Sequence, residues 1–194
     1  MPLLAGFEVV QLGDGLAAAV CARLLADIGA NVTCIGPDTS THLAAYLNHD
    51  KTIVTHDRAA RRGLSVANLI VCEGRPDDLR HQQRDADALR RVNPSAALVH
   101  ISPFGQTGQK ANDPASDLTL FFASGIARLL TGQVDDLAEA PIRPVGEQSA
   151  FIGGLAAACA GMHAALAAKP GAVIDVSIQE ALATLAMTEL RAPG

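Results

Sequence analysis

Short runs of β-forming residues alternate with amphipathic helical stretches through the first half of this chain, and this alternation restricts the fold more than any other feature. Strands separated by helices pair in parallel, through right-handed crossovers that place helices on both faces of the sheet. The pattern therefore predicts an α/β fold with a doubly wound, Rossmann-like parallel sheet. The expected strands are Phe7–Leu12, Asn31–Ile35, Thr52–Thr55, Leu69–Cys72 and Ala97–Ile101, and the expected helices are Leu16–Ile28, a short helix that ends at Leu47 after a cap within 38–40, and a charged crossover helix over Asp77–Arg91.

The pattern changes after Ser102. We expect a polar loop, a helix over Asp117–Leu130, a loop over Thr131–Gly146, a helix of small residues over Ser149–Ala168, and a last strand–helix unit. Ser177 and Glu180 have the spacing of a capping box at the start of that last helix. A chain of 194 residues suits one domain with a proper core. We therefore expect a single domain over residues 1–194, with an α/β core over about 1–115 and helices plus one strand–helix unit over 116–194.

Composition and charge argue against several classes of protein. The formal net charge of −5 and the 3% of aromatic residues do not suit nucleic-acid binding, which needs a basic surface and often uses aromatic stacking. Cys21, Cys34, Cys72 and Cys159 are too far apart for a zinc motif or a disulfide framework, so we expect reduced thiols and no metal site. The start lacks the regions of a signal peptide, and the apolar stretch Ala156–Ala168 is shorter than a membrane span of about 20 residues. We therefore predict a cytoplasmic protein without nucleic-acid or membrane partners.

The first predicted strand runs into Gly13, Asp14 and Gly15, which with Ala18 fit a GxGxxA dinucleotide fingerprint. Glycines there let the backbone approach a pyrophosphate, and the start of the following helix favours an anion. The acidic residue expected on a ribose at the end of the second strand is absent, because that strand leads to Gly36. The motif is therefore read either as a tight structural turn or as a site for another nucleotide, with NAD(P) or FAD as the weaker alternative.

Three further segments lie next to predicted strands and carry groups that suit a nucleotide. One holds Asn48 and Lys51 before the third strand, and another holds Gly74 and Arg75 after the fourth. The carboxyl ends of parallel strands meet at one edge of the sheet, where ligands bind in such folds. The alternative reading is a solvated lysine, an arginine ion pair and an ordinary glycine turn. The third segment, which follows the fifth strand, consists of Phe104, Gly105, Gln106, Thr107 and Gly108.

The same segments resemble the N-terminal part of class III coenzyme A transferases, the CaiB/BaiF family that includes formyl-CoA transferase-like proteins. SPFGQTG and IDVSIQEAL are the most specific matches. The resemblance implies that the core binds the CoA nucleotide near Gly13–Gly15, Asn48, Lys51, Gly74-Arg75 and Phe104–Gly108. It implies CoA or an acyl-CoA thioester as substrate, no tightly bound cofactor, and either a homo-oligomer of interlocked subunits or a partner chain that supplies the C-terminal half of the pattern. The family motifs are matched, in order, by Gly15–Val32, Leu47–Asp57, Glu73–Leu79, Ser102–Gly108, Asp117–Gly132 and Pro170–Leu182.

The sequence departs from this family at the catalytic position. The resemblance implies an aspartate nucleophile at the head of the small-residue helix, which forms an acyl anhydride and then an aspartyl-CoA thioester. Ala150 stands at that position, and a methyl group cannot perform either step. Glu147 becomes a substitute only under a shifted alignment and otherwise helps to cap the helix. Asp117, after Ser116, reads as a helix cap and not as a nucleophile.

Three functions therefore stay open. The first is a CoA transferase that moves CoA between carboxylic acids as one chain of a larger assembly. The second is a non-catalytic CoA-binding or structural subunit, which Ala150 favours. The third is an NAD(P)- or FAD-binding oxidoreductase domain, which only Gly13–Ala18 favours. We expect the isolated chain to be inactive in CoA transfer.

Overall fold

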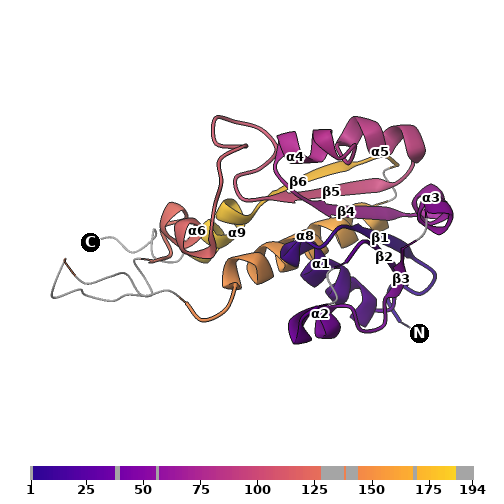
Figure 1. The fold of residues 1–194 in the computed structure, drawn as a ribbon, viewed down its shortest axis with the longest axis horizontal. Helices are drawn as coiled ribbons and strands as arrows, with labels where there is room; N and C mark the ends of the chain where they lie inside the picture. Colours follow the sequence, from indigo (N-terminus) through magenta and orange to yellow (C-terminus); the bar gives the residue numbers. More distant parts are fainter. Residues whose placement is uncertain are drawn as a thin grey trace.

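The computed structural model describes residues 2–37, 40–55, 57–127, 138, 144–167 and 170–186. The strands form one sheet in the order β3-β2-β1-β4-β5-β6, and every neighbouring pair is parallel (Figure 1). This order and the parallel pairing confirm the predicted doubly wound α/β fold. The strands are β1 (Glu8–Leu12), β2 (Asn31–Ile35), β3 (Thr52–Val54), β4 (Leu69–Glu73), β5 (Ala97–Ser102) and β6 (Val173–Ser177).

Helices cover both faces of the sheet, and this is why the central strands read as nearly continuous apolar runs. Side chains alternate between the faces along each strand, so that Val9 packs on the side of α1 and α8 while Val10 packs on the other side. Figure 1 shows α4 and α5 above the sheet and α1, α2 and α8 below it. The first layer is α1 (Leu16–Asp27), α2 (His42–Leu47) and α8 (Gln148–Leu166), and the second is α3 (Asp57–Val66), α4 (Pro76–His81) and α5 (Ala86–Val92).

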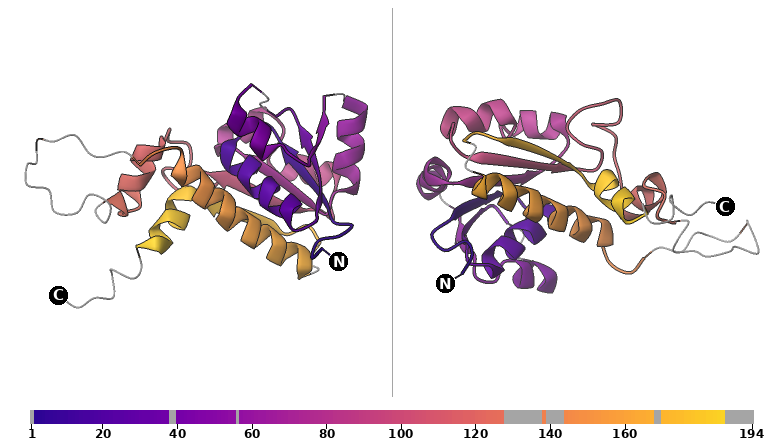
Figure 2. Two further views of the ribbon diagram at one scale, coloured as in Figure 1. Left: turned by 90° about the horizontal axis from the view of Figure 1, so that it is seen from below. Right: turned by 180° about the vertical axis from the view of Figure 1, so that it is seen from behind.

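Two further helices, α6 (Asp117–Ala123) and α9 (Ile178–Leu185), pack against one end of α8, beyond the carboxyl ends of β5 and β6 (Figure 2). The small residues of α8 allow it to lie directly on α1. A Cβ atom added to Gly154 would lie 2.6 Å from the carbonyl oxygen of Ala17. The small-residue composition of this segment therefore reflects close helix packing.

The structure differs from the predicted elements in several places. The charged stretch forms two helices, because Pro76 starts α4, Gln83 adopts a positive φ of 55°, and the Asp85 side chain caps α5 by accepting two backbone N–H groups. Helix α3 was not predicted. Thr41 caps α2, while positions 38 and 39 lie outside the described residues. The predicted helix from Asp117 ends at Ala123, and most of the predicted loop over 131–146 also lies outside them.

None of the helices in the described ranges is both long and apolar enough to cross a membrane.

Candidate functional site

A cleft of about 410 Å³ opens where the chain order of the sheet reverses, between the carboxyl ends of β1 and β4. Ligands of open α/β sheets bind at such switch points, because the neighbouring connections diverge there and leave a crevice. Gly13, Asp14 and Gly15 follow β1 and line one side of this switch-point cleft, and Gly74 and Arg75 follow β4 and line the other. The fold thus brings together two of the segments that the sequence predicted, from positions about sixty residues apart.

The start of α1 is already occupied by a carboxylate of the protein. The Glu73 Oε2 atom accepts a hydrogen bond of 2.9 Å from the Ala18 backbone N–H. Burial raises the pKa of Glu73, and the backbone N–H groups of Ala18 and Ala17 oppose that rise. Gly15 makes room for this contact, since a Cβ atom there would lie 2.4 Å from Oε2.

This contact explains the glycine fingerprint. In dinucleotide-binding folds the start of this helix holds the pyrophosphate, whereas here Glu73 takes that place. The turn over Gly13–Gly15 therefore fits the alternative of a tight structural turn, and nothing in this geometry favours NAD(P) or FAD.

Two arginines reach the switch-point cleft. The Arg75 guanidinium makes an ion pair of 2.7 Å with Asp78 and donates to the Asn112 carbonyl at 3.2 Å. Arg84 was missed by the sequence interpretation, which placed it on a solvated helix. Its Nη1 atom lies over Gly13, 2.6 Å from where a Cβ atom would stand, and within the described chain its guanidinium has no hydrogen-bond or ion-pair partner. The positive φ of Gln83 ends α4 and turns the chain so that Arg84 lies at the edge of the sheet. Glutamine has no preference for this conformation, so the sequence did not indicate the turn.

Lys51 lies inside the fold and does not reach the switch-point cleft. Its Nζ donates to Gln11 Oε1 at 2.8 Å and to the Ala19 carbonyl at 2.9 Å. Burial lowers the pKa of its ammonium group to about 8. Lys51 thus connects β1, α1 and the start of β3. The predicted contact between Lys51 and a CoA phosphate remains a prediction.

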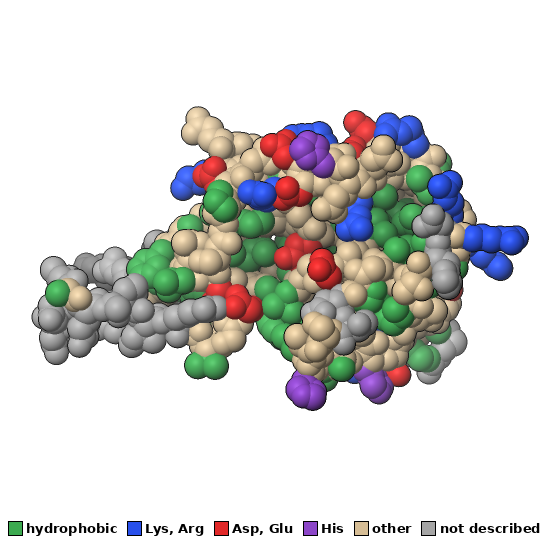
Figure 3. Space-filling model, viewed as in Figure 1, with side chains coloured by type: hydrophobic (Ala, Val, Ile, Leu, Met, Phe, Trp, Pro, Cys, Tyr) green, Lys and Arg blue, Asp and Glu red, His purple; other side chains and the backbone are tan. Residues whose placement is uncertain are grey.

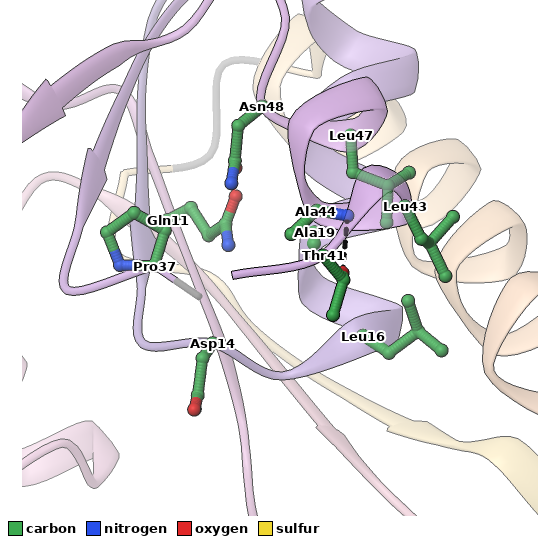
Figure 4. Close-up of a pocket in the computed structure, with 10 residues that line it drawn as sticks. All are labelled: Gln11, Asp14, Leu16, Ala19, Pro37, Thr41, Leu43, Ala44, Leu47 and Asn48. Carbon is green, nitrogen blue, oxygen red and sulfur yellow. Dashed lines mark hydrogen bonds between the residues drawn. The ribbon is translucent and has the colours of Figure 1, made fainter. Parts of the chain in front are cut away.

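Asn48 borders a smaller pocket of about 210 Å³ between the end of β1 and helix α2. In Figure 4 the Gln11 and Asn48 side chains point toward one another, across from the apolar side chains of Leu16 and Leu43. Asp14 lines both this pocket and the switch-point cleft, so the two hollows are neighbours. A pocket with apolar walls and amide groups suits a planar ring that has polar atoms at its edge, such as a nucleobase.

No residue of the loop over Phe104–Gly108 lines the switch-point cleft, and Gln106 and Thr107 instead line a third hollow of about 350 Å³. Gly105 and Gly108 have φ values of +85° and +97°, which glycine adopts without strain. The Gln106 side chain donates to the Gly74 carbonyl at 2.9 Å, so this loop is tied to the turn that carries Arg75. Phe104 is covered by the Lys110 ammonium group, 5.8 Å from the ring centroid.

The start of α8, where the family resemblance implies a nucleophile, carries Ala150 on a half-buried position against the core. Glu147 is the N-cap residue, but its side chain makes no cap hydrogen bond, which corrects the predicted cap. Asp117 provides that contact instead, because its buried Oδ1 accepts from the Ser149 N–H at 2.8 Å. The N-cap of α6 is Ser116, so Asp117 caps a different helix from the one predicted.

The surroundings of the site are mixed in charge. Figure 3 shows acidic and basic side chains next to one another where α4 and α5 lie. Asp14, Glu73 and Asp78 border the switch-point cleft together with the two arginines. Among the described residues, no group of three or more His, Cys, Asp or Glu side chains could hold a metal ion.

An open parallel sheet with this order and a crevice at its switch point defines a doubly wound α/β protein. The comparison with known sequences is more specific, because the family model of CoA-transferase family III matches residues 4–192. The chain belongs to CoA-transferase family III.

Similar proteins agree with this assignment. A CaiB/baiF CoA-transferase family protein of Caenorhabditis elegans is 26% identical over 194 residues, which cover 94% of this chain and 56% of that protein. The succinyl-CoA–D-citramalate CoA-transferase of Chloroflexus aurantiacus is 26% identical, over 92% of this chain and 50% of that protein. The crystal structure of Rv3272 from Mycobacterium tuberculosis has the same fold, with a TM-score of 0.81, 22% identity, and coverage of 98% of this chain and 58% of that one. The chain thus spans about half the length of the curated relatives it matches.

Proposed function

We propose that this chain binds CoA or an acyl-CoA thioester at the switch-point cleft and serves in CoA transfer between carboxylic acids as one chain of a larger assembly. The observation that carries the binding proposal is the cleft itself, where the Arg84 guanidinium projects over Gly13 beside Arg75. Phosphates are the part of CoA that a pair of guanidinium groups recognises best. The neighbouring pocket around Gln11 and Asn48 supplies apolar and amide groups for the base.

Calorimetry with CoA tests the binding proposal. Arg84→Ala is expected to weaken binding by roughly 1–3 kcal/mol, because a charge-assisted contact is lost. Arg91→Ala, on the exposed face of α5, is the matched control and should leave the affinity unchanged. Arg75→Ala should have a smaller effect than Arg84→Ala, since Arg75 already pairs with Asp78. Equal affinities for the wild-type, Arg84→Ala and Arg91→Ala proteins would remove the phosphate site from this cleft.

A non-catalytic CoA-binding subunit is the second candidate, and Ala150 is the observation that favours it. Incubation of the purified chain with acyl-CoAs and carboxylate acceptors, followed by trapping with hydroxylamine, separates the two. We expect no turnover by the chain alone. Turnover that disappears in Glu147→Gln would make Glu147 the nucleophile. Activity that appears only with a chain carrying the C-terminal part of the family pattern would favour the assembly.

A further inference from the structure

Asp175 makes an unusual contact for a residue in a strand. Aspartate is depleted in strands, yet Asp175 is exposed within β6, at one edge of the sheet. Its two carboxylate oxygens accept the Gln106 backbone N–H at 3.0 and 2.8 Å. Gly105 brings the loop close, since a Cβ atom there would stand 3.4 Å from Asp175 Oδ2.

The contact continues toward the switch-point cleft. The same Gln106 donates its side-chain amide to the Gly74 carbonyl at 2.9 Å, and Gly74 directly precedes Arg75. The Gly74 N–H in turn donates to the Ile101 carbonyl at 2.9 Å, which fixes the turn on β5. One residue, Gln106, therefore connects a carboxylate on the edge strand with the turn that lines the cleft.

We propose that Asp175 is a positioning residue of the CoA site, which holds Gln106 and through it the Gly74–Arg75 turn. An ionised carboxylate is a strong acceptor for a backbone N–H. Without it, the Gln106 N–H loses its partner, the loop relaxes, and the side-chain amide no longer fixes the Gly74 carbonyl. This inference rests on the proposed function, because it assigns a role within the same site.

The alternative explanation is that Asp175 only stabilises the fold, together with the charged groups around it. His100 is the cross-strand neighbour of Asp175 and is buried, and its Nε2 lies 3.0 Å from the Arg84 carbonyl oxygen. Arg80, Asp85 and Asp87 line the same hollow of about 350 Å³. If Asp175 served only the stability of this hollow, its replacement would lower the stability of the fold without a selective effect on CoA.

The test compares Asp175→Ala and Asp175→Asn in the full chain with Asp87→Ala as the control from the same hollow. Hydrogen exchange of the Gln106 amide, measured by NMR without ligand, reports the loop, and calorimetry with CoA reports the site. Asp175→Ala should speed the exchange and weaken CoA binding about tenfold, the usual effect of one lost charge-assisted bond. Asp175→Asn keeps one acceptor and should give an intermediate result, while Asp87→Ala should leave both the amide exchange and the CoA affinity unchanged.

The possible results distinguish a failure of the positioning role of Asp175 from a failure of the proposed CoA site. Unchanged exchange in Asp175→Ala, or faster exchange with unchanged CoA affinity, would refute the positioning role while leaving CoA binding intact. A lower urea midpoint with no selective effect on CoA would also refute it. Absence of CoA binding by the wild-type chain would refute the proposed function, and the exchange data would then decide whether Asp175 holds the loop.

Discussion

Replacement of Lys51 by methionine is expected to change how the stability of this protein depends on pH. Lys51 is only 9% exposed, and burial lowers the pKa of its ammonium group from 10.5 to about 8. Between these two values the unfolded chain binds more protons than the folded chain, so the free energy of unfolding rises with pH. Below the folded pKa both states are protonated, and the folded protein then carries the full unfavourable effect of the buried charge.

The size of the effect follows from the two pKa values. Between pH 7 and pH 9 the wild-type protein should gain about 1.3 kcal/mol in the free energy of unfolding from this one group. Methionine has a similar length and does not titrate, so the variant lacks this gain. Burial raises the pKa of the Cys21 and Cys34 thiols to about 12 and about 11. Both thiols therefore stay protonated in the folded state at pH 9, and their effect cancels in the difference between the two proteins.

Urea unfolding at pH 7, 8 and 9 measures this difference. The free energy of unfolding of the wild type, minus that of Lys51→Met, should increase by about 1.3 kcal/mol over the range. Lys110→Met replaces an exposed lysine and should show no such trend. Parallel profiles for the wild type and Lys51→Met would refute the view of Lys51 as a buried amine held by Gln11.

Further outcomes test the neighbouring contacts. Gly15→Ala should destabilise the protein by roughly 1–3 kcal/mol in urea unfolding, because the methyl group displaces the Glu73 carboxylate. The control Gly63→Ala lies in a helix with ordinary spacing and should stabilise it by roughly 0.5–1 kcal/mol. Asp117→Ala removes the acceptor at the start of α8 and should destabilise by about 1–2 kcal/mol in the same assay. If a CoA phosphate meets Lys51, binding at pH 9 must take up a proton, which calorimetry in buffers of different ionisation enthalpy detects and Lys51→Met abolishes.

The sequence predicted the strands and their parallel pairing because those features depend on local composition. Val9 and Val10 both read as apolar, and burial on both faces of β1 explains why. The segments after β1 and β4 were placed at one edge by the general geometry of parallel sheets, and the switch-point cleft lies there. These predictions needed no knowledge of individual side-chain contacts.

The contacts that distinguish the site depend on tertiary structure, and the sequence did not predict them. Nothing in the residue type of Gln83 indicates the left-handed conformation that brings Arg84 to the cleft. The burial of Lys51 depends on its distant partner Gln11, forty residues earlier in the chain. Glu73 was part of a recognised motif, but its place at the start of α1 follows only from the adjacency of β1 and β4.

Catalysis depends on which carboxylates lie at the start of α8. Transfer through a covalent intermediate needs a carboxylate that a thioester can reach, and Ala150 provides none. Asp117 is buried, and one of its oxygens binds a backbone N–H of the helix. Glu147 stands three residues earlier, a displacement of about 4.5 Å along a helix, whereas an error of about 1 Å can reduce the rate a hundredfold. Among the described residues, the start of α8 therefore carries no carboxylate at the position of Ala150, and we expect the chain alone to be inactive in CoA transfer.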